Sequence, residues 1–103
     1  MEKAFLVIDM QNSLSEIPES KNVIDEINKR IEFYRNSNNE IIFIQHIDSE
    51  MPFNSYNWQL INSINNKDDD TYLTKKYPDA FFDTDLKEYL DNNNIKNIEI
   101  CGA

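Results

Sequence analysis

Glycine, cysteine and histidine each occur only once in this 103-residue chain. A lone cysteine cannot form an internal disulfide, and together with a lone histidine it cannot form a Cys/His zinc cluster. The single glycine, Gly102, excludes a glycine-rich phosphate loop and the G-x-G-x-x-G fingerprint of dinucleotide-binding folds. We therefore expect no metal ion and no nucleotide cofactor.

Basic residues and long apolar runs are also scarce. The sequence has 10 Lys and Arg against 19 Asp and Glu, a net charge of −9 that repels phosphate backbones and anionic membranes. No apolar run approaches the roughly 20 residues that cross a bilayer. Met1-Glu2-Lys3 leaves no room for a signal peptide before the first apolar run. We expect a single cytoplasmic domain with no nucleic-acid or membrane partner.

The stretch from Ala4 to Gln11 is the clearest structural signal in the sequence. Its first five residues are all apolar, without the alternation of a half-exposed strand, and the run ends at Asp9. Such a run is typical of a parallel strand that is covered on both faces. Because open α/β sheets bind ligands outside the carboxyl ends of their strands, Asp9 is a candidate functional residue. The alternative is a carboxylate that caps a neighbouring loop or helix.

A strand–helix–strand unit is predicted next. Apolar residues at a spacing of three to four predict an amphipathic helix from Ser20, a good N-cap, to about Arg35. Glu40–His46 then repeats the apolar pattern of the first strand. The two strands of such a unit lie parallel, so His46 is expected at the same edge as Asp9. His46 is a candidate base or ligand; the alternative is an ordinary loop residue with satisfied hydrogen bonds.

The long segment 47–70 is predicted to be a functional lid or binding segment. Trp58, Ile61 and Ile64 have near-helical spacing, which predicts a short helix or turn that packs into the core. The run from Lys67 to Asp70 is typical of a solvated turn, with a cation site as the alternative.

The remaining sequence completes an α/β pattern. It predicts a third strand over 71–74, a helix over 85–90 and a fourth strand over 97–101. Asp or Thr at the start of that helix, with Glu88 three residues after Asp85, resembles a capping box, and the asparagines after it provide a stop. We expect a doubly wound parallel sheet of about four strands with helices on its faces.

Four motifs together cover essentially the whole chain: FLVIDMQNSL, IIFIQH, KKYPDAFF-T-L and IKNIEICG. In this order they resemble the isochorismatase-like cysteine hydrolases, which include isochorismatases, nicotinamidases and related amidohydrolases. The specific part is LVIDMQ followed by K-x-Y-P-D-A-F-F-x-T-x-L, since either motif alone is a weak signal. The resemblance implies a Rossmann-like fold and hydrolysis of a small molecule.

The resemblance also implies roles for particular residues. The aspartate of the I-D-x-Q motif is the general base of the family, which here is Asp9. The family's lysine corresponds to Lys75, expected to stabilise charge in the site, with Lys76 as its solvent-facing neighbour. The substrate contacts that we expect are Gln11, His46 and Phe81.

The family's nucleophilic cysteine lies several residues beyond an I-C-G element. Cys101 matches the cysteine within that element, and we interpret it as a small apolar residue and not a reactive thiolate. We therefore expect a single isochorismatase-like domain over 1–103 that is incomplete at its C-terminus. Without the nucleophile we expect no amide C–N hydrolysis. Vinyl-ether hydrolysis chiefly needs proton delivery to carbon, so we expect it only to be impaired.

Two classes of function follow from this pattern. The first is a hydrolase in which Asp9 acts as base or acid and Lys75 stabilises charge. The second is a non-catalytic truncated fragment or a small-ligand binding remnant. In either class the fourth strand is expected to form an unprotected sheet edge, which predicts a homo-oligomer.

Overall fold

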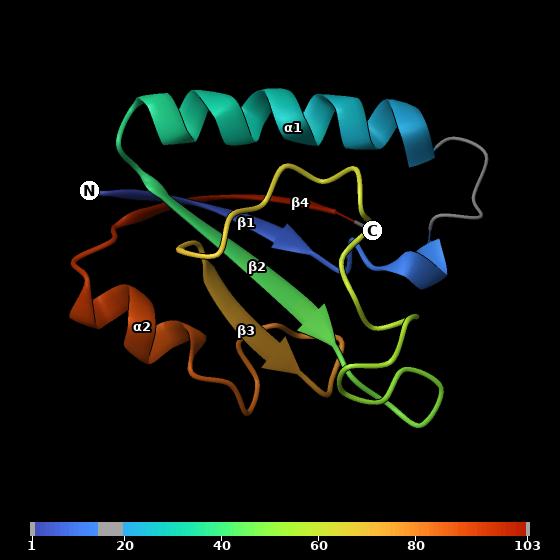
Figure 1. Ribbon diagram of the computed structural model, residues 1–103. Coiled ribbons are helices and arrows are strands. Elements are labelled where there is room, and N and C mark those ends of the chain that lie inside the picture. Colours follow the sequence, from blue (N-terminus) through green and yellow to red (C-terminus); the bar gives the residue numbers. More distant parts are fainter. Residues whose placement is uncertain (1, 15–19, 103) are drawn as a thin grey trace.

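The computed structural model describes residues 2–14 and 20–102 (Figure 1). In chain order the elements are β1 (Lys3–Ile8), the 3-10 helix η1 (Asn12–Leu14), α1 (Ser20–Asn36), β2 (Glu40–His46), β3 (Thr71–Lys75), α2 (Leu86–Asn92) and β4 (Asn97–Gly102). Each predicted strand is present, within one residue of its predicted ends. The predicted N-cap side chain, Ser20, and the loop residues 15–19 lie outside the part of the chain that is described.

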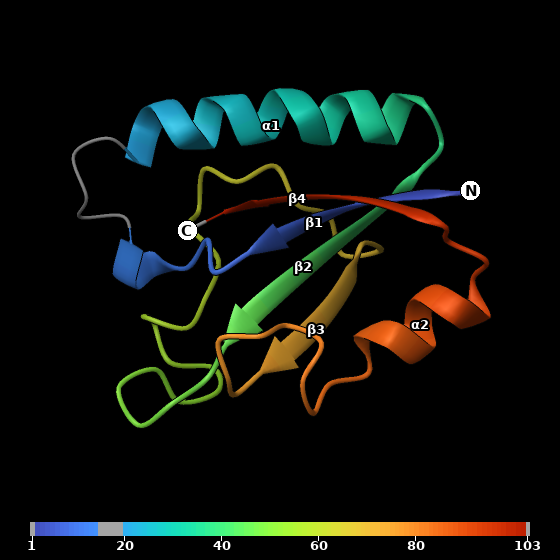
Figure 2. The same ribbon diagram turned by 180° about the vertical axis from the view of Figure 1, so that it is seen from behind.

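The four strands form one parallel sheet in the order β3-β2-β1-β4. The chain moves outward from β1 through β2 to β3 and then returns to the other side of β1 for β4. The direction of winding therefore changes between β1 and β4. Figure 1 and Figure 2 show α1 along one face of the sheet and α2 against the other. This arrangement confirms the predicted α/β doubly wound fold.

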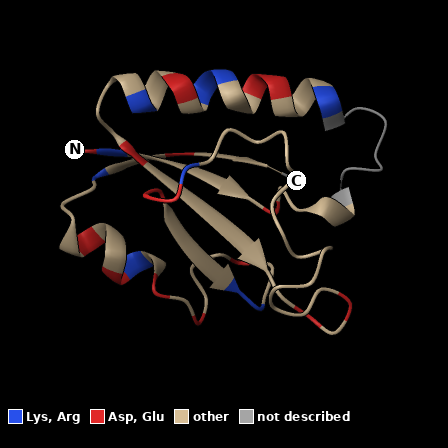
Figure 3. Cartoon of the chain, viewed as in Figure 1, with Lys and Arg blue, Asp and Glu red and all other residues tan. Residues whose placement is uncertain are grey.

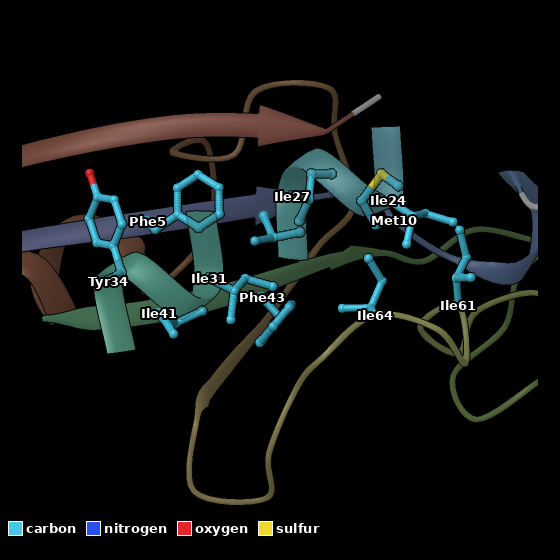
Figure 4. Close-up of a cluster of buried hydrophobic side chains, with 11 residues drawn as sticks. Phe5, Met10, Ile24, Ile27, Ile31, Tyr34, Ile41, Phe43, Ile61 and Ile64 are labelled. Carbon is cyan, nitrogen blue, oxygen red and sulfur yellow. The ribbon is translucent and has the colours of Figure 1, made fainter. Parts of the chain in front are cut away.

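The larger core lies between α1 and the sheet. The residues that α1 buries recur every three to four positions, which makes one face of the helix apolar. Phe5 of β1 stacks on Tyr34 of α1 with ring centroids 5.1 Å apart. Figure 4 shows these side chains together with the buried residues of the long segment. The cluster consists of Phe5, Val7, Met10, Ile24, Ile27, Ile31, Tyr34, Ile41, Phe43, Ile61 and Ile64.

The core on the α2 side is smaller, and β4 lies outside it. This cluster consists of Ala4, Leu6, Ile42, Ile44, Ala80, Leu86, Leu90 and Ile95. Ile98 and Ile100 pair in register with Ala4 and Leu6, so their side chains point to the same face. They are nevertheless 39% and 56% exposed. Within the described residues no strand pairs with the outer edge of β4, so this strand combines an open edge with an open face.

The segment between β2 and β3 forms turns and one isolated antiparallel bridge, Gln11 to Leu60. Of the two predicted alternatives, turn rather than short helix is correct. Ile61 and Ile64 are buried in the α1-side core, as predicted. Trp58 is only partly buried and does not belong to that core; its ring lies against Phe53, with the ring centroids 4.7 Å apart.

The predicted capping box at the start of α2 is wrong. Asp85 makes no side-chain capping bond, and its φ of −86° and ψ of 6° are unlike the extended conformation of an N-cap. Of the two residue types predicted for the helix start, Asp or Thr, the threonine makes the contact: Thr84 Oγ1 accepts a hydrogen bond from the Leu86 N–H at 3.3 Å. At the other end Asn94 has a φ of 56°, the left-handed conformation predicted for the stop.

Charged side chains tie α1 to other parts of the fold, and Figure 3 shows acidic and basic residues interspersed along this helix. Arg30 forms an ion pair with Glu99 of β4 at 2.6 Å, and Arg35 forms one with Asp70 at 2.6 Å. The Asp70 carboxylate also accepts a hydrogen bond from the Lys67 N–H. The acidic run therefore closes a turn, in line with the first of its two interpretations.

Candidate active site

Asp9 directly follows β1 and turns the chain sharply at the carboxyl edge of the sheet. Its φ is 62°, in the left-handed region that few residues other than glycine adopt, although Asp and Asn enter it more readily. Its N–H donates to the Ile44 carbonyl at 3.0 Å, and its own carbonyl accepts from the Gln11 N–H at 2.8 Å. Strained backbone of this kind is concentrated at functional sites. Hydrogen bonds thus hold the main chain of Asp9 on both sides.

Lys75 is the last residue of β3, and its side chain is only 3% exposed. Its Nζ lies 3.3 Å from Asp9 Oδ1 and donates a hydrogen bond to the Tyr77 carbonyl at 3.3 Å. Asp9 Oδ1 is buried and receives no hydrogen bond from the described residues, so its contact with Lys75 is an ion pair. Lys76, by contrast, is exposed, as expected for the solvent-facing neighbour.

His46 ends β2, between the strands that carry Asp9 and Lys75. Its Nδ1 lies 3.5 Å from Lys75 Nζ, and its Nε2 lies 3.4 Å from Asp48 Oδ2. Its side chain is 21% exposed. The sheet therefore brings Asp9, His46 and Lys75 together from three strands that are separate in the sequence.

Gln11 is almost completely buried, and its carboxamide serves the main chain. Its Oε1 accepts from the His46 N–H at 3.0 Å, while its Nε2 donates to the His46 and Trp58 carbonyls, both at 2.8 Å. The side chain fixes the end of β2 and the long segment relative to β1. The carboxamide oxygen and nitrogen of Gln11 therefore already have hydrogen-bond partners within the protein. The substrate contact expected for Gln11 stays a prediction.

A cavity of about 360 Å³ opens at this edge of the sheet, a size suited to a small molecule. Its lining consists of Asp9, Gln11, Ser13, His46, Met51, Lys75 and Pro78. Four of the five predicted site residues therefore share one cavity. The fifth, Phe81, is 41% exposed and does not line it.

Sequence reasoning did not identify Ser13, Asp48 or Met51 as neighbours of the site. Ser13 lies two residues after Gln11 in a polar stretch, which was the available signal. Asp48 follows His46 by two residues in a turn-forming stretch, whereas nothing in the sequence around Met51 distinguishes it. Their positions depend on the path of the loop after β2.

Cys101 lies on β4 and packs, partly buried, against the core on the α1 side. Burial, with a smaller contribution from Glu99, raises the pKa of its thiol to about 12. At neutral pH the thiol is therefore protonated, as expected for a small apolar residue and not for a nucleophile.

Among the described residues, no three or more His, Cys, Asp or Glu side chains gather where they could hold a metal ion. No helix in this part of the chain is both long and apolar enough to cross a membrane.

Comparisons with known proteins agree on one family. The isochorismatase domain model matches residues 3–103. A solved isochorismatase family protein is 34% identical, with a TM-score of 0.94, over 99% of this chain and 64% of that chain. The uncharacterized isochorismatase family protein YddQ of Bacillus subtilis (strain 168) is 26% identical over 99% of this chain and 62% of its own length.

A more distant structure has the same fold. The N-carbamoylsarcosine amidase from Thermoplasma acidophilum is 24% identical, with a TM-score of 0.86, over 99% of this chain and 68% of that chain. The present chain spans less than two thirds of the length of the first two relatives. Its parallel sheet with helices on both faces matches these structures, and the chain belongs to the isochorismatase family.

Proposed function

We propose that this chain carries the proton-transfer part of a small-molecule hydrolase site, with Asp9 as base or acid and Lys75 as charge stabiliser. The observation that carries the proposal is the Asp9–Lys75 ion pair in the wall of the cavity. The Lys75 ammonium is buried, whereas the Asp9 side chain is 31% exposed and lines a space for a ligand. A buried cation beside a reachable carboxylate favours negative charge that develops nearby.

Two reactions use such a pair differently. In amide C–N hydrolysis Asp9 takes the proton of a nucleophile, which attacks the carbonyl carbon while Lys75 stabilises the negative charge. Cys101, the only cysteine in the sequence, does not supply that nucleophile because its pKa is raised to about 12. Vinyl-ether hydrolysis needs chiefly a proton delivered to carbon, and in this reaction Asp9 acts as the acid after it takes up a proton from solvent. The residues of this chain therefore favour the second reaction.

The test compares Asp9→Asn with Asp25→Asn, the same change at an exposed position on α1. Both proteins are assayed against a panel of small vinyl ethers and amides. Because general acid–base catalysis typically contributes about 10²- to 10⁴-fold, we expect Asp9→Asn to lose that factor of turnover and Asp25→Asn to lose none. Equal rates for the two variants would remove Asp9 from the proposed role.

A second candidate function is binding of a small ligand without turnover, or a non-catalytic remnant. The protonated Cys101 thiol favours it, since this chain then has a cavity and an ion pair but no thiolate. It predicts that cavity-lining amide protons shift in NMR titrations with panel compounds that are not consumed. Consumption of any compound in an Asp9-dependent manner would contradict it.

We also propose that copies of this chain associate in solution through β4. The support is the open outer edge of this strand and the exposed Ile98 and Ile100 on its α2 side. A cytoplasmic location and the absence of nucleic-acid partners stay predictions; the charge of −9 supports the latter.

A further inference from the structure

The imidazole ring of His46 lies between the charged groups of Lys75 and Asp48. Hydrogen bonds to both groups are compatible with only one arrangement of the ring protons. On one side Lys75 Nζ lies 3.5 Å from Nδ1. An ammonium group has three N–H donors and no acceptor, so Nδ1 must be unprotonated to bind it. On the other side Asp48 Oδ2 lies 3.4 Å from Nε2. A carboxylate only accepts hydrogen bonds, so Nε2 must carry the proton.

The Asp48 carboxylate is itself fixed. Its Oδ1 accepts hydrogen bonds from the Glu50 and Met51 N–H groups, both at 2.8 Å. This tight turn leaves Oδ2 for His46. The main chain of His46 is held by Gln11 at both its N–H and its carbonyl. Hydrogen bonds therefore fix both the Asp48 carboxylate and the main chain of His46.

An unprotonated Nδ1 on His46 also provides an acceptor for the Lys75 ammonium. Three groups with acceptor atoms surround Nζ within 3.5 Å: the Asp9 carboxylate, the Tyr77 carbonyl and the imidazole of His46. The Tyr77 carbonyl and the unprotonated Nδ1 of His46 can each accept an N–H of the ammonium, while Asp9 balances its charge through the ion pair. A proton on Nδ1 would remove one acceptor and place an N–H against a buried cation.

We infer that His46 is a positioning residue: Asp48 fixes its neutral Nε2–H tautomer, and Nδ1 then holds the Lys75 ammonium against Asp9. The connected groups run from the 48–51 turn through Asp48, His46 and Lys75 to Asp9. This role adds Asp48 to the site and comes in addition to the position of His46 in the cavity wall. The effect of this positioning role on hydrolysis rests on the proposed function. The tautomer of His46 does not depend on that function.

The first test reads the tautomer directly in the full chain. Because the sequence has one histidine, an imidazole ¹⁵N spectrum of histidine-labelled protein needs no assignment. We expect the neutral ring to show a protonated Nε2 and an unprotonated Nδ1. A predominant Nδ1–H form, or rapid exchange between equal amounts of both, would overturn the inference. This result is independent of whether any substrate is hydrolysed.

Two matched pairs of variants then test the neighbours. Asp48→Asn places an amide donor against Nε2, so the Nε2–H form should lose its predominance, while the exposed Asp69→Asn should leave it unchanged. Lys75→Met should shift the Nδ1 resonance by removing its donor, while Lys76→Met should not. If either variant matched its control, the corresponding contact would be excluded.

The wild-type spectrum and the Asp48→Asn pair still decide the question if Lys75→Met does not fold. The spectrum could show the expected tautomer while the protein is inactive or its activity does not depend on Asp9. That combination would contradict the proposed hydrolase function and leave the positioning role of His46 intact. The reverse result, Asp9-dependent turnover with the wrong tautomer, would sink only the positioning role.

Discussion

On one face of the sheet the 17 residues of α1 contact β1, β2 and β4, whereas on the other face the seven residues of α2 leave β4 uncovered. Glu99 and Cys101 of β4 point to the first face, and Ile98 and Ile100 point to the second. The same strand therefore has one side that is packed and ion-paired and one side that is open.

Two residues of the candidate site come from the less covered face. His46 and Lys75 pair in register, and their side chains follow Ile42 and Ile44 on the α2 side of the sheet. Packing against α1 is thus separated from the groups proposed to act on a ligand. We expect changes on the α1 side to alter stability and changes on the α2 side to alter binding or association.

The largest effect is expected from a buried residue of α1. Ile31→Ala removes a side chain with no exposed surface and should lower the free energy of unfolding by about 2–5 kcal/mol. Ile100→Ala, the same change on the open side, should cost less than about 1 kcal/mol. Denaturant unfolding measures both, and similar losses for the two variants would contradict the unequal covering of the faces.

A smaller effect, on association and not on folding, is expected at β4. Ile100→Lys places a charge on the exposed side of an edge strand, which is a common way to prevent strands from pairing. Light scattering should show the unaltered chain above the mass of one copy and the variant at that mass. Val23→Lys on α1 is the control and should leave the mass unchanged. An unaltered chain that is monomeric would remove the proposal of self-association.

The smallest effect is expected for the ion pair between β4 and α1. The hydrogen bonds from Arg30, followed by one from Tyr34, hold the pKa of Glu99 below its usual value of 4.5. The pair therefore adds stability above pH 4.5, and this contribution is lost as the pH falls through the lowered folded-state pKa. Because both side chains are about two-fifths exposed, solvent keeps the contribution small.

Unfolding experiments across this pH range test that pair. Glu99→Gln should be slightly less stable than the unaltered chain at neutral pH and should lose less stability on acidification. Glu88→Gln, an exposed change on α2, provides the control. Parallel acid profiles for Glu99→Gln and the unaltered chain would show that the ion pair adds nothing.

The fold was predictable because the sequence pattern of each central strand indicates how it is buried. The apolar runs before Asp9 and His46 describe strands buried on both faces, and this alone predicts a parallel sheet. The capping box failed because the Asp85–Glu88 spacing carries no information on the backbone angles of Asp85. Those angles follow from the turn before α2, in which Thr84 binds the Ala80 carbonyl.

The site was predictable only in part, for a similar reason. Asp9 and His46 were placed by the ends of their strands, and Lys75 by the family resemblance. Asp48 was missed because its contact with His46 depends on a tight turn in the long segment. The catalytic and substrate-binding roles of these residues stay predictions, including the contact proposed for Phe81.

The left-handed backbone at Asp9 also limits how this position can change in related sequences. At a φ of 62° a β-branched side chain clashes with the main chain, whereas Asn, Asp and Gly fit. Replacement by Val, Ile or Thr would therefore disturb the turn as well as remove the carboxylate. On the proposed function of Asp9, a relative that gives up proton transfer while keeping this fold is expected to do so through Asn or Gly at position 9.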